Sequence, residues 1–446
     1  MRKVAITLAV LIPFCALLTA FVYNLPPVHE RLAGRVEALR AEIKYRLNPP
    51  EEAVFVPQQQ PTLVLPTPTA TNTDQPPTPT NPGPTNTPVP SPTPTQTPLP
   101  LPESAILDGV VYVDQHGRWN YCGPANLAMA LNFWGWPGNR DDVAAVVKPG
   151  VADPDLDFIQ RGKWDKNVMP YEMANFVAEH TGYSVVTRSG GETELVKRLI
   201  AGGFPVLVEK GYYEADYTGK VAWLGHYLFT TGYDDRSGEF IVQDAYLKPG
   251  KNMRVDYQTY LDGWRSFNYL FMVIYPPSRE AELFALLGPW ADPEYANRNA
   301  LRIAEEEIQT QAGIDEFFAW FNKGTSHVNL IQYNEAGLAY DRAFQVYALL
   351  ESDDTQRPYR ILWYQTGPYW AYFYTGRYQD TINLANTTLY DTIAEPTLEE
   401  SLYWRGQAYL ALGQTGEAIA DFREAVRLNP NFAVGLNMLA QLGVTP

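Results

Sequence analysis

Three hydrophobic patterns follow one another along the chain. A long apolar run, interrupted by Pro13, covers residues 4–23, and short segments typical of β-strands lie between residues 184 and 276. After residue 279, apolar side chains return every three or four positions, which is typical of amphipathic helices. Because the period changes twice, the pattern predicts several folded units rather than one core.

The N-terminal run predicts a membrane segment. About 20 apolar residues span a bilayer, and the basic residues Arg2 and Lys3 precede the run. We therefore predict that residues 1–24 are a membrane anchor or a signal segment, with the rest of the chain extracytoplasmic. No small-x-small cleavage site follows, which favours an uncleaved single-pass transmembrane anchor over a secreted protein.

Two segments separate this run from the first folded unit. Residues 25–56 carry one apolar stripe, marked by Leu32, Val36 and Leu39, and predict a short helical juxtamembrane stalk. Residues 57–102 consist largely of proline and threonine, so they have too few apolar side chains to bury a core. We expect this proline-rich linker to be an extended, polyproline-like spacer.

Residues 103–278 predict an α+β unit, with helices first and an antiparallel sheet later. The strongest helix signal begins near Tyr121, carries Pro124 in its first turn and stops at Gly135. The turn Asp235–Gly238 joins two strands as a hairpin. The predicted helices are 121–135, 141–147 and 171–180, and the predicted strands are 184–188, 204–210, 226–233, 239–246 and 269–276.

Residues 279–446 predict an all-α domain of tetratricopeptide-like repeats. The last stretch carries the small and aromatic residues of that repeat at its spacings, and two earlier stretches carry parts of it. These residues are Gly406, Tyr409, Ala418, Phe422, Ala425 and Pro430 in the last stretch, Trp320, Gly324, Ala336, Tyr340 and Ala343 in the first, and Tyr369, Tyr372, Gly376 and Tyr378 between them. The alternative is a generic amphipathic bundle, and either structure is a non-catalytic module.

Charge and cysteine content exclude several classes of function and of structural site. The 446 residues include 34 basic and 50 acidic side chains, and the net charge of −16 opposes binding to nucleic acid phosphates. The only cysteines are Cys15, inside the apolar run, and Cys122. This count excludes a disulfide framework in the folded part and a zinc site built from several thiolates. No motif in the sequence implies a cofactor or a metal.

Cys122 has the local context of a nucleophile. It stands at the predicted start of a helix, where unpaired N–H groups and the helix dipole favour a thiolate. Gly123 allows a close approach of the backbone, and the main-chain N–H of Cys122 itself can stabilise an oxyanion. The alternative for a lone cysteine is a buried, inert side chain.

The base and its orienting group are found among few candidates. Of the five histidines, His226 stands at the beginning of a strong strand, just after Gly225. A histidine there is more often structural, but the pairing with a cysteine at a helix start reverses that preference. Asp244 ends the next strand of the same hairpin, so both side chains are expected at one end of the sheet. That is the geometry in which a carboxylate orients an imidazole.

The α+β unit resembles a known family in three segments, which read YCGPANLAMAL, GFPVLVE and GHYLFTTGYDDRSGEFIVQDAY. This family comprises the peptidases that process bacteriocin double-glycine leaders, and the likeness is closer to its branch outside the transporters. The resemblance implies a papain-like cysteine peptidase fold and a triad of Cys122, His226 and Asp244. It also implies a glutamine before the cysteine that completes the oxyanion hole. Gln115 is our choice, with an ordinary loop glutamine as the alternative.

Together these features predict an extracytoplasmic thiol protease that cleaves peptide or amide bonds through a thioester acyl-enzyme. The helical repeats are expected to bind the peptide or protein substrate or another protein partner, and the N-terminal segment to contact the membrane. No nucleic acid, cofactor or metal is expected. Two alternatives stay open: a catalytically silent surface scaffold with a papain-like fold, and an enzyme that transfers the acyl group to an amine.

Overall fold

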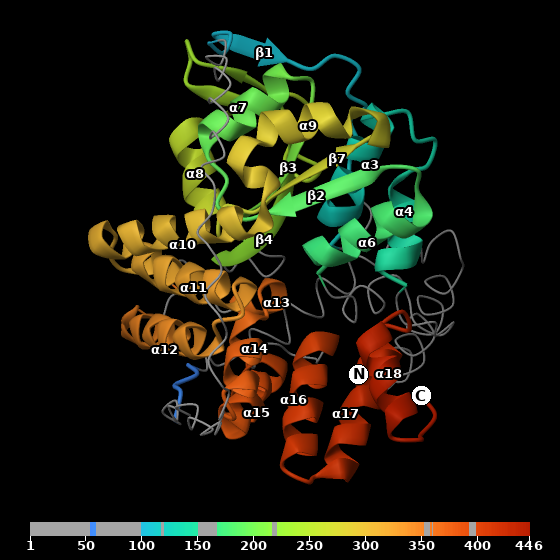
Figure 1. The fold of residues 1–446 in the computed structure, drawn as a ribbon, viewed down its shortest axis with the longest axis vertical. Coiled ribbons are helices and arrows are strands. Elements are labelled where there is room, and N and C mark those ends of the chain that lie inside the picture. The colour runs from blue at the N-terminus through green and yellow to red at the C-terminus, as the bar shows by residue number, and fades with distance from the viewer. Residues whose placement is uncertain are drawn as a thin grey trace, which may run out of the picture.

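The computed structural model describes residues 54–58, 100–116, 120–149, 167–215, 221–351, 357–358, 360–391 and 398–446. The predicted membrane anchor, most of the predicted stalk and most of the proline-rich linker lie outside these ranges. Among the described helices, none is both long and apolar enough to cross a membrane. The fold is α+β, as predicted, with the sheet at one end of the molecule and a helical array at the other (Figure 1).

The α+β region, from β1 to β7, interleaves helices and strands. Its elements are β1 (Ser104–Ile106), α3 (Cys122–Phe133), α4 (Arg140–Val147), α6 (Pro170–His180), β2 (Ser184–Arg188), α7 (Thr193–Ala201), β3 (Val206–Ala215), β4 (Val221–Asp234), β5 (Glu239–Gln243), β6 (Met253–Asp256), α8 (Tyr257–Arg265) and β7 (Phe271–Tyr275). The sequence pattern predicted the three helices before β2 and five of these strands. It did not predict α7, α8, β1 or β6.

The strands form one antiparallel sheet within the described residues. Their order is β2-β7-β3-β4-β5-β6, and β1 also pairs with β4. Alternate side chains point to opposite faces, so Leu207 packs against α3, α4 and α6, while Val208 packs against α7, α8 and α9. Helix α3 therefore lies on one face of the sheet and contacts β4, the strand that carries His226.

From Glu280 onward, the described chain is helical. The helices are α9 (Glu280–Leu287), α10 (Pro293–Thr310), α11 (Ile314–Asn329), α12 (Tyr333–Leu349), α13 (Ile361–Tyr364), α14 (Gly367–Tyr374), α15 (Tyr378–Asn386), α16 (Glu399–Ala411), α17 (Thr415–Leu428) and α18 (Ala433–Gln441). Helices α11 and α12, α14 and α15, and α16 and α17 pack as pairs. Gly324 lies against the ring of Tyr340, and Gly406 against that of Phe422, so small residues allow close helix contact.

One aromatic cluster joins the α+β region to the helical region. The ring of Trp223 in β4 lies 5.7 Å from that of Phe318 in α11 and 5.6 Å from that of Tyr364 in α13. Phe267, which follows α8, lies 5.9 Å from Tyr364. All four side chains are buried. The two regions therefore share a hydrophobic core.

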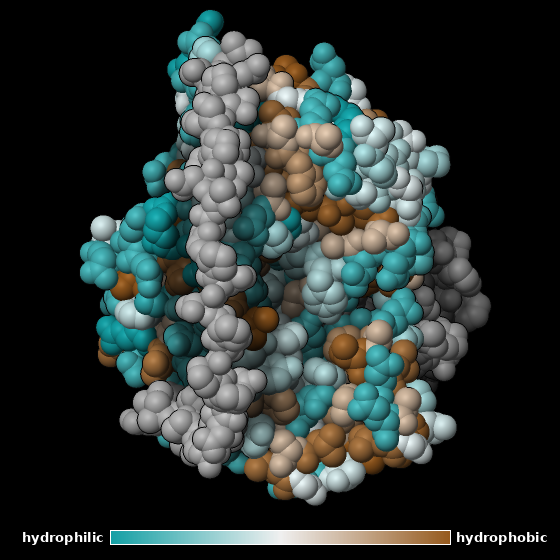
Figure 2. Space-filling view, viewed as in Figure 1, coloured by the Kyte–Doolittle hydropathy of each residue, from teal (hydrophilic) through white to brown (hydrophobic). Residues whose placement is uncertain are grey.

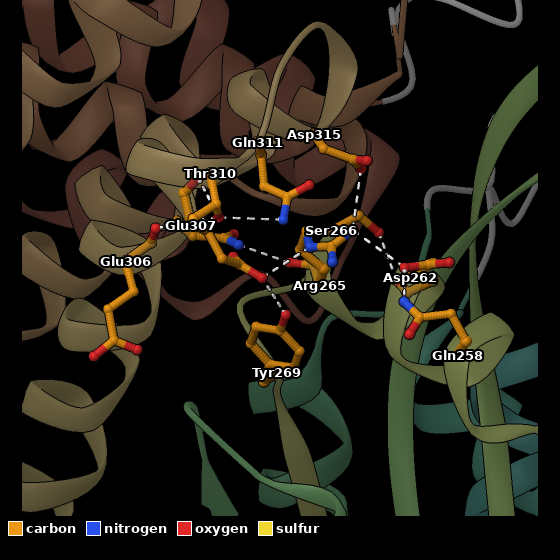
Figure 3. Close-up of polar contacts among 12 residues, drawn as sticks. Gln258, Asp262, Arg265, Ser266, Tyr269, Glu306, Glu307, Thr310, Gln311 and Asp315 are labelled. Atoms are coloured by element: carbon orange, nitrogen blue, oxygen red, sulfur yellow. Dashed lines mark hydrogen bonds and ion pairs between the residues drawn. The ribbon is translucent and has the colours of Figure 1, made fainter. Parts of the chain in front are cut away.

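A polar network joins the same two regions (Figure 3). Arg265 of α8 donates to Glu307 of α10 at 2.8 Å and to Asp315 at the start of α11 at 3.2 Å. The hydroxyl of Tyr269 also donates to Glu307. Although burial opposes it, these carboxylates raise the pKa of Arg265 above its ordinary value. In the same view as Figure 1, the surface mixes apolar and polar side chains over both regions (Figure 2).

Candidate active site

Cys122 is the first residue of α3 and is a buried free thiol. The chain enters the helix through Asn120, whose φ of 47° lies in the left-handed region that asparagine tolerates. Lys148 Nζ donates to the carbonyl of Asn120 at 3.2 Å and so holds this turn. A Cβ at Gly123 would lie 3.1 Å from the Cβ of Val168, so glycine allows the close approach that the sequence predicted.

His226 and Asp244 meet in the interior. Nε2 of His226 lies 2.9 Å from Oδ1 of Asp244, and the two side chains are 4% and 0% exposed. The same Oδ1 accepts the main-chain N–H groups of Tyr246 at 2.8 Å and Leu247 at 2.9 Å. These hydrogen bonds fix the carboxylate. Because Nε2 is engaged, Nδ1 of the ring is left to serve Cys122.

The place of His226 in its strand differs from the prediction. The sequence pattern put His226 at the beginning of a strand, but β4 begins at Val221, and His226 pairs with Lys210 of β3. The reason is that β3 and β4 continue as one long hairpin, in which Ala215 still pairs with Val221. The imidazole is therefore carried by paired backbone on both sides, which restrains it more than a strand end would.

The three side chains form a coupled set of charges. Although burial opposes it, a hydrogen bond and the positive charge of His226 lower the pKa of the Cys122 thiol. Burial also opposes charge on His226, but Asp244 and Cys122 raise its pKa to about 10. Against burial, His226 and two main-chain N–H groups hold the pKa of Asp244 at about 2. This arrangement favours a thiolate–imidazolium pair at neutral pH.

Asn126 ties the start of α3 to β4, and the sequence interpretation missed it. Its Nδ2 donates to the carbonyl of Cys122 at 2.9 Å and to that of Tyr227 at 3.0 Å, and the side chain is fully buried. One amide thus fixes the helix that carries the thiol relative to the strand that carries His226. The signal in the sequence is an amide side chain within the apolar first turns of the helix.

Gln115 lies beside the loop that holds Asp244. Its main-chain N–H donates to the carbonyl of Ala245 at 2.8 Å. Its side chain is 9% exposed, and Oε1 has no hydrogen-bond partner among the described residues. The glutamine therefore reaches the neighbourhood of the site with a buried amide, and its part in an oxyanion hole stays a prediction.

Glu209 and Lys210 are two further buried ionisable side chains that the sequence interpretation did not assign. Glu209, 1% exposed, stands opposite Tyr227 in the pairing of β3 with β4. Burial, and then the negative charge of Cys122, raise the pKa of Glu209 well above its ordinary value. Lys210 stands opposite His226, and burial lowers its pKa. Because their strand neighbours are largely apolar, no local pattern marks these two ionisable side chains as buried near His226.

Tyr364 brings the helical region to the site. A Cβ at Gly225 would lie 2.6 Å from the ring of Tyr364, so glycine allows this contact directly before His226. Burial is the main cause that raises the pKa of Tyr364 above its ordinary value. The helical region therefore forms part of the surroundings of His226 in β4.

The other four histidines lie elsewhere in the sequence, and those that the structure describes have different surroundings. His29 lies outside it, His180 is exposed at the end of α6, His116 lies 2.9 Å from Asp114, and His327 lies in α11. Within the described ranges, no group of three or more His, Cys, Asp or Glu side chains is arranged to hold a metal.

Comparison with known proteins finds two family matches in this chain. Residues 107–272 match the Peptidase_C39 like family, and residues 399–432 match the tetratricopeptide repeat. No curated protein has a significant sequence match. One similar solved structure is a C39-like peptidase from Bacillus anthracis, with 15% identity over 38% of this chain and 96% of that chain and a TM-score of 0.30. Another is xylellain, a cysteine protease from Xylella fastidiosa, with 16% identity over 40% of this chain and 87% of that chain and a TM-score of 0.27.

Both predicted resemblances are therefore confirmed at the level of the family. The match to the peptidase family runs from the residue after β1 into the start of β7, and the repeat match spans α16 and α17. The chain therefore resembles a papain-like peptidase of the Peptidase_C39 like family fused to tetratricopeptide repeats.

Proposed function

We propose that the protein is an extracytoplasmic cysteine peptidase that hydrolyses peptide or amide bonds. Cys122 is the nucleophile, His226 is the acid and base, and Asp244 orients the imidazole. The observation that carries this proposal is the buried 2.9 Å hydrogen bond between His226 Nε2 and Asp244, next to a thiol whose pKa is lowered. The match to the Peptidase_C39 like family supports the same class of reaction.

The charge arrangement supports a two-step reaction. The Cys122 thiolate attacks the carbonyl carbon, and a C–S bond forms as the carbonyl becomes a tetrahedral oxyanion. His226 then donates its Nδ1 proton to the leaving amine, the C–N bond breaks, and a thioester remains. Water attacks the thioester, His226 accepts a proton from it, and the C–S bond breaks to release the acid. Asp244 stabilises the imidazolium throughout without taking its proton.

The oxyanion needs donors on the opposite side of the carbonyl from His226. The start of α3 supplies the main-chain N–H of Cys122, which has no partner in a preceding turn of the helix. Gln115 is the second donor in this proposal, since its amide is buried beside the Asp244 loop. Removal of one such donor lowers kcat by roughly 10²–10³ in related chemistry.

The remaining parts of the proposal concern location and partners. The apolar run at residues 4–23 supports a membrane anchor, with the peptidase domain outside the cytoplasm. Tetratricopeptide repeats imply a protein partner, so the helical region is proposed to bind the substrate or a second protein.

Thiol reactivity against pH tests this proposal. We would alkylate the full chain with iodoacetamide and follow the peptide that contains Cys122 by mass spectrometry, in the wild type and in His226→Ala. The wild-type rate is expected to rise through a thiol pKa below its ordinary value of about 8.5 and to be already high at neutral pH. At pH 6 the variant is expected to react about 100-fold more slowly.

His180→Ala is the matched control, because His180 is exposed and belongs to the same region. Its alkylation profile should follow the wild type. A wild-type thiol that titrates near 8.5 and is indifferent to His226 would exclude the peptidase mechanism. The papain-like domain would then serve binding alone.

A further inference from the structure

A short segment at the junction of the predicted stalk and the proline-rich linker packs on the helical region. Val54–Gln58 lies beside α12 and α15, where Figure 1 draws it in blue. The ring of Phe55 is 5.0 Å from that of Phe344 in α12, in an edge-to-face arrangement, and 6.1 Å from that of Tyr372 in α14. Phe55 is 6% exposed and joins the hydrophobic core of the repeats.

The segment is held the way a bound peptide is held, by one anchor side chain. Phe55 is buried and Val54 is partly buried against the same core, while Val56 is 53% exposed. From Phe55 onward, buried or partly buried side chains alternate with exposed ones, as in an extended backbone with one side facing the helices. A single aromatic anchor in a well-packed site commonly carries most of the binding free energy of a peptide.

The helices also supply a polar contact for the segment backbone. The main-chain N–H of Gln58 donates to Oδ1 of Asp380 in α15 at 2.9 Å, and Asp380 is fully buried. Arg377 binds Oδ2 of Asp380 at 3.0 Å and both oxygens of Asp341 at 2.9 Å. Two carboxylates thus share one guanidinium, and Oδ1 of Asp380 accepts the charge-assisted hydrogen bond from the segment backbone.

We propose that α12, α14 and α15 form a binding site for a short extended segment with a phenylalanine anchor, and that the protein occupies this site with its own Val54–Gln58. Residues 59–99 connect the segment to the α+β region, so the segment is a tethered ligand. Its high effective concentration at the site can keep the site occupied even when the affinity of the free segment is low. A free segment of the same chemistry competes for the site. This inference specifies the partner-binding part of the proposed function and is independent of the peptidase chemistry.

The site is tested by supplying the segment in trans. A fluorescent peptide of residues 51–60 is titrated into the full chain in detergent, as wild type and as Phe55→Ala. Removal of the anchor is expected to free the site, so the peptide should bind Phe55→Ala saturably and the wild type at least 10-fold more weakly. Val56→Ala is the matched control, because Val56 points away from the helices, and it should behave like the wild type.

Two measurements keep the test decisive. Phe344→Leu, introduced beside Phe55→Ala, changes the pocket and should weaken peptide binding. Amide hydrogen exchange should show residues 54–58 protected in the wild type and in Val56→Ala, and exposed in Phe55→Ala. If Phe55→Ala unfolds, the smaller change Phe55→Leu takes its place, with intermediate binding expected.

The inference is overturned if the peptide binds Phe55→Ala, or Phe55→Leu in its place, no better than the wild type. Fast exchange at residues 54–58 in the wild type would also overturn it. Neither readout involves hydrolysis, so an inactive Cys122 leaves this result unchanged, and failure here leaves the alkylation test of the active site intact.

Discussion

Buried charge occurs in both regions of the molecule, with different cations. In the α+β region, Asp244 faces His226, a cation that can lose its proton, and Oδ2 of Asp244 has no hydrogen-bond partner among the described residues. In the helical region, Arg405 binds Asp421 through two hydrogen bonds of 2.8 and 2.6 Å, and both side chains are 8% exposed. Arginine stays charged at any pH that a folded protein tolerates.

The two kinds of ion pair serve different roles: one can support proton transfer, and the other holds structure in place. A carboxylate shared between an imidazole and backbone N–H groups can change the protonation of its partner, which is what a nucleophile requires. A carboxylate saturated by the planar fork of arginine fixes helix positions and supports a ligand site, but transfers no proton. We therefore expect changes at the Asp244–His226 pair to alter the reactivity of Cys122. Changes at the arginine–carboxylate pairs should alter the free energy of unfolding.

The largest effect is expected for Arg377→Met in the helical region. The change leaves Asp380 buried and Asp341 partly buried without their guanidinium, and such a loss destabilises by about 3–5 kcal/mol. The free energy of unfolding from urea titration measures it, while alkylation of Cys122 at pH 7 should stay unchanged. Arg298→Met is the control, since its pair with Glu294 is 60% and 63% exposed, and should change stability by less than about 1 kcal/mol. Equal losses for both variants would contradict the distinction.

Asp244→Asn should have the next largest effect, on reactivity. The amide keeps the shape of the side chain but removes the charge that raises the pKa of His226. A less positive His226 stabilises the thiolate less, so the pKa of Cys122 should rise toward its ordinary value and the alkylation rate at pH 7 should drop about 10–100-fold. The sign for stability also follows. Asp244 stabilises above its ordinary pKa and loses this effect as pH falls toward 2, so the variant should be less sensitive to acid.

Asp234→Asn controls for the loss of one negative charge in the same hairpin. Asp234 lies at the end of β4 and faces Arg254 at 3.5 Å near the surface. Its alkylation profile should superimpose on that of the wild type. If Asp244→Asn also superimposed, the proposed role of Asp244 would be refuted.

Glu209→Gln should have the smallest effect and extends the comparison to a buried carboxyl without an ion pair among the described residues. Its folded-state pKa is raised, so ionisation above its ordinary value favours the unfolded chain. Glutamine removes this penalty and should raise the melting temperature by a few degrees at pH 8, about 1 kcal/mol, with little change at pH 5. Glu239→Gln, at a surface pair with Arg254, should not show this pH difference. An equal shift at both pH values would argue against a neutral Glu209.

The sequence predicted what depends on local order. Tyr121, Cys122 and Pro124 mark the start of α3 because a helix start is a local pattern. The turn at Asp235–Gly238 predicted the hairpin of β4 and β5, and that hairpin brings His226 to Asp244. The roles of these side chains in catalysis remain the proposal tested above.

The sequence failed to predict what depends on distant contacts. The amide of Asn126 has its second partner at Tyr227, and Phe55 has its partners at Phe344 and Tyr372, so no local pattern specifies either contact. The omission of α7 has another reason. Its apolar residues do recur at helical spacing, so the sequence carries a local signal for this helix.

The aromatic cluster of Trp223, Phe267, Phe318 and Tyr364 also limits how the two regions can be recombined during evolution. Repeat modules are commonly regarded as exchangeable parts, since each repeat contacts only its neighbours. Here a partner module without a counterpart of Tyr364 would leave buried aromatic surface of β4 open to water and prone to aggregation. The peptidase domain and its repeats are therefore expected to have changed together as one inherited unit, with shuffling confined to the segments outside this shared core.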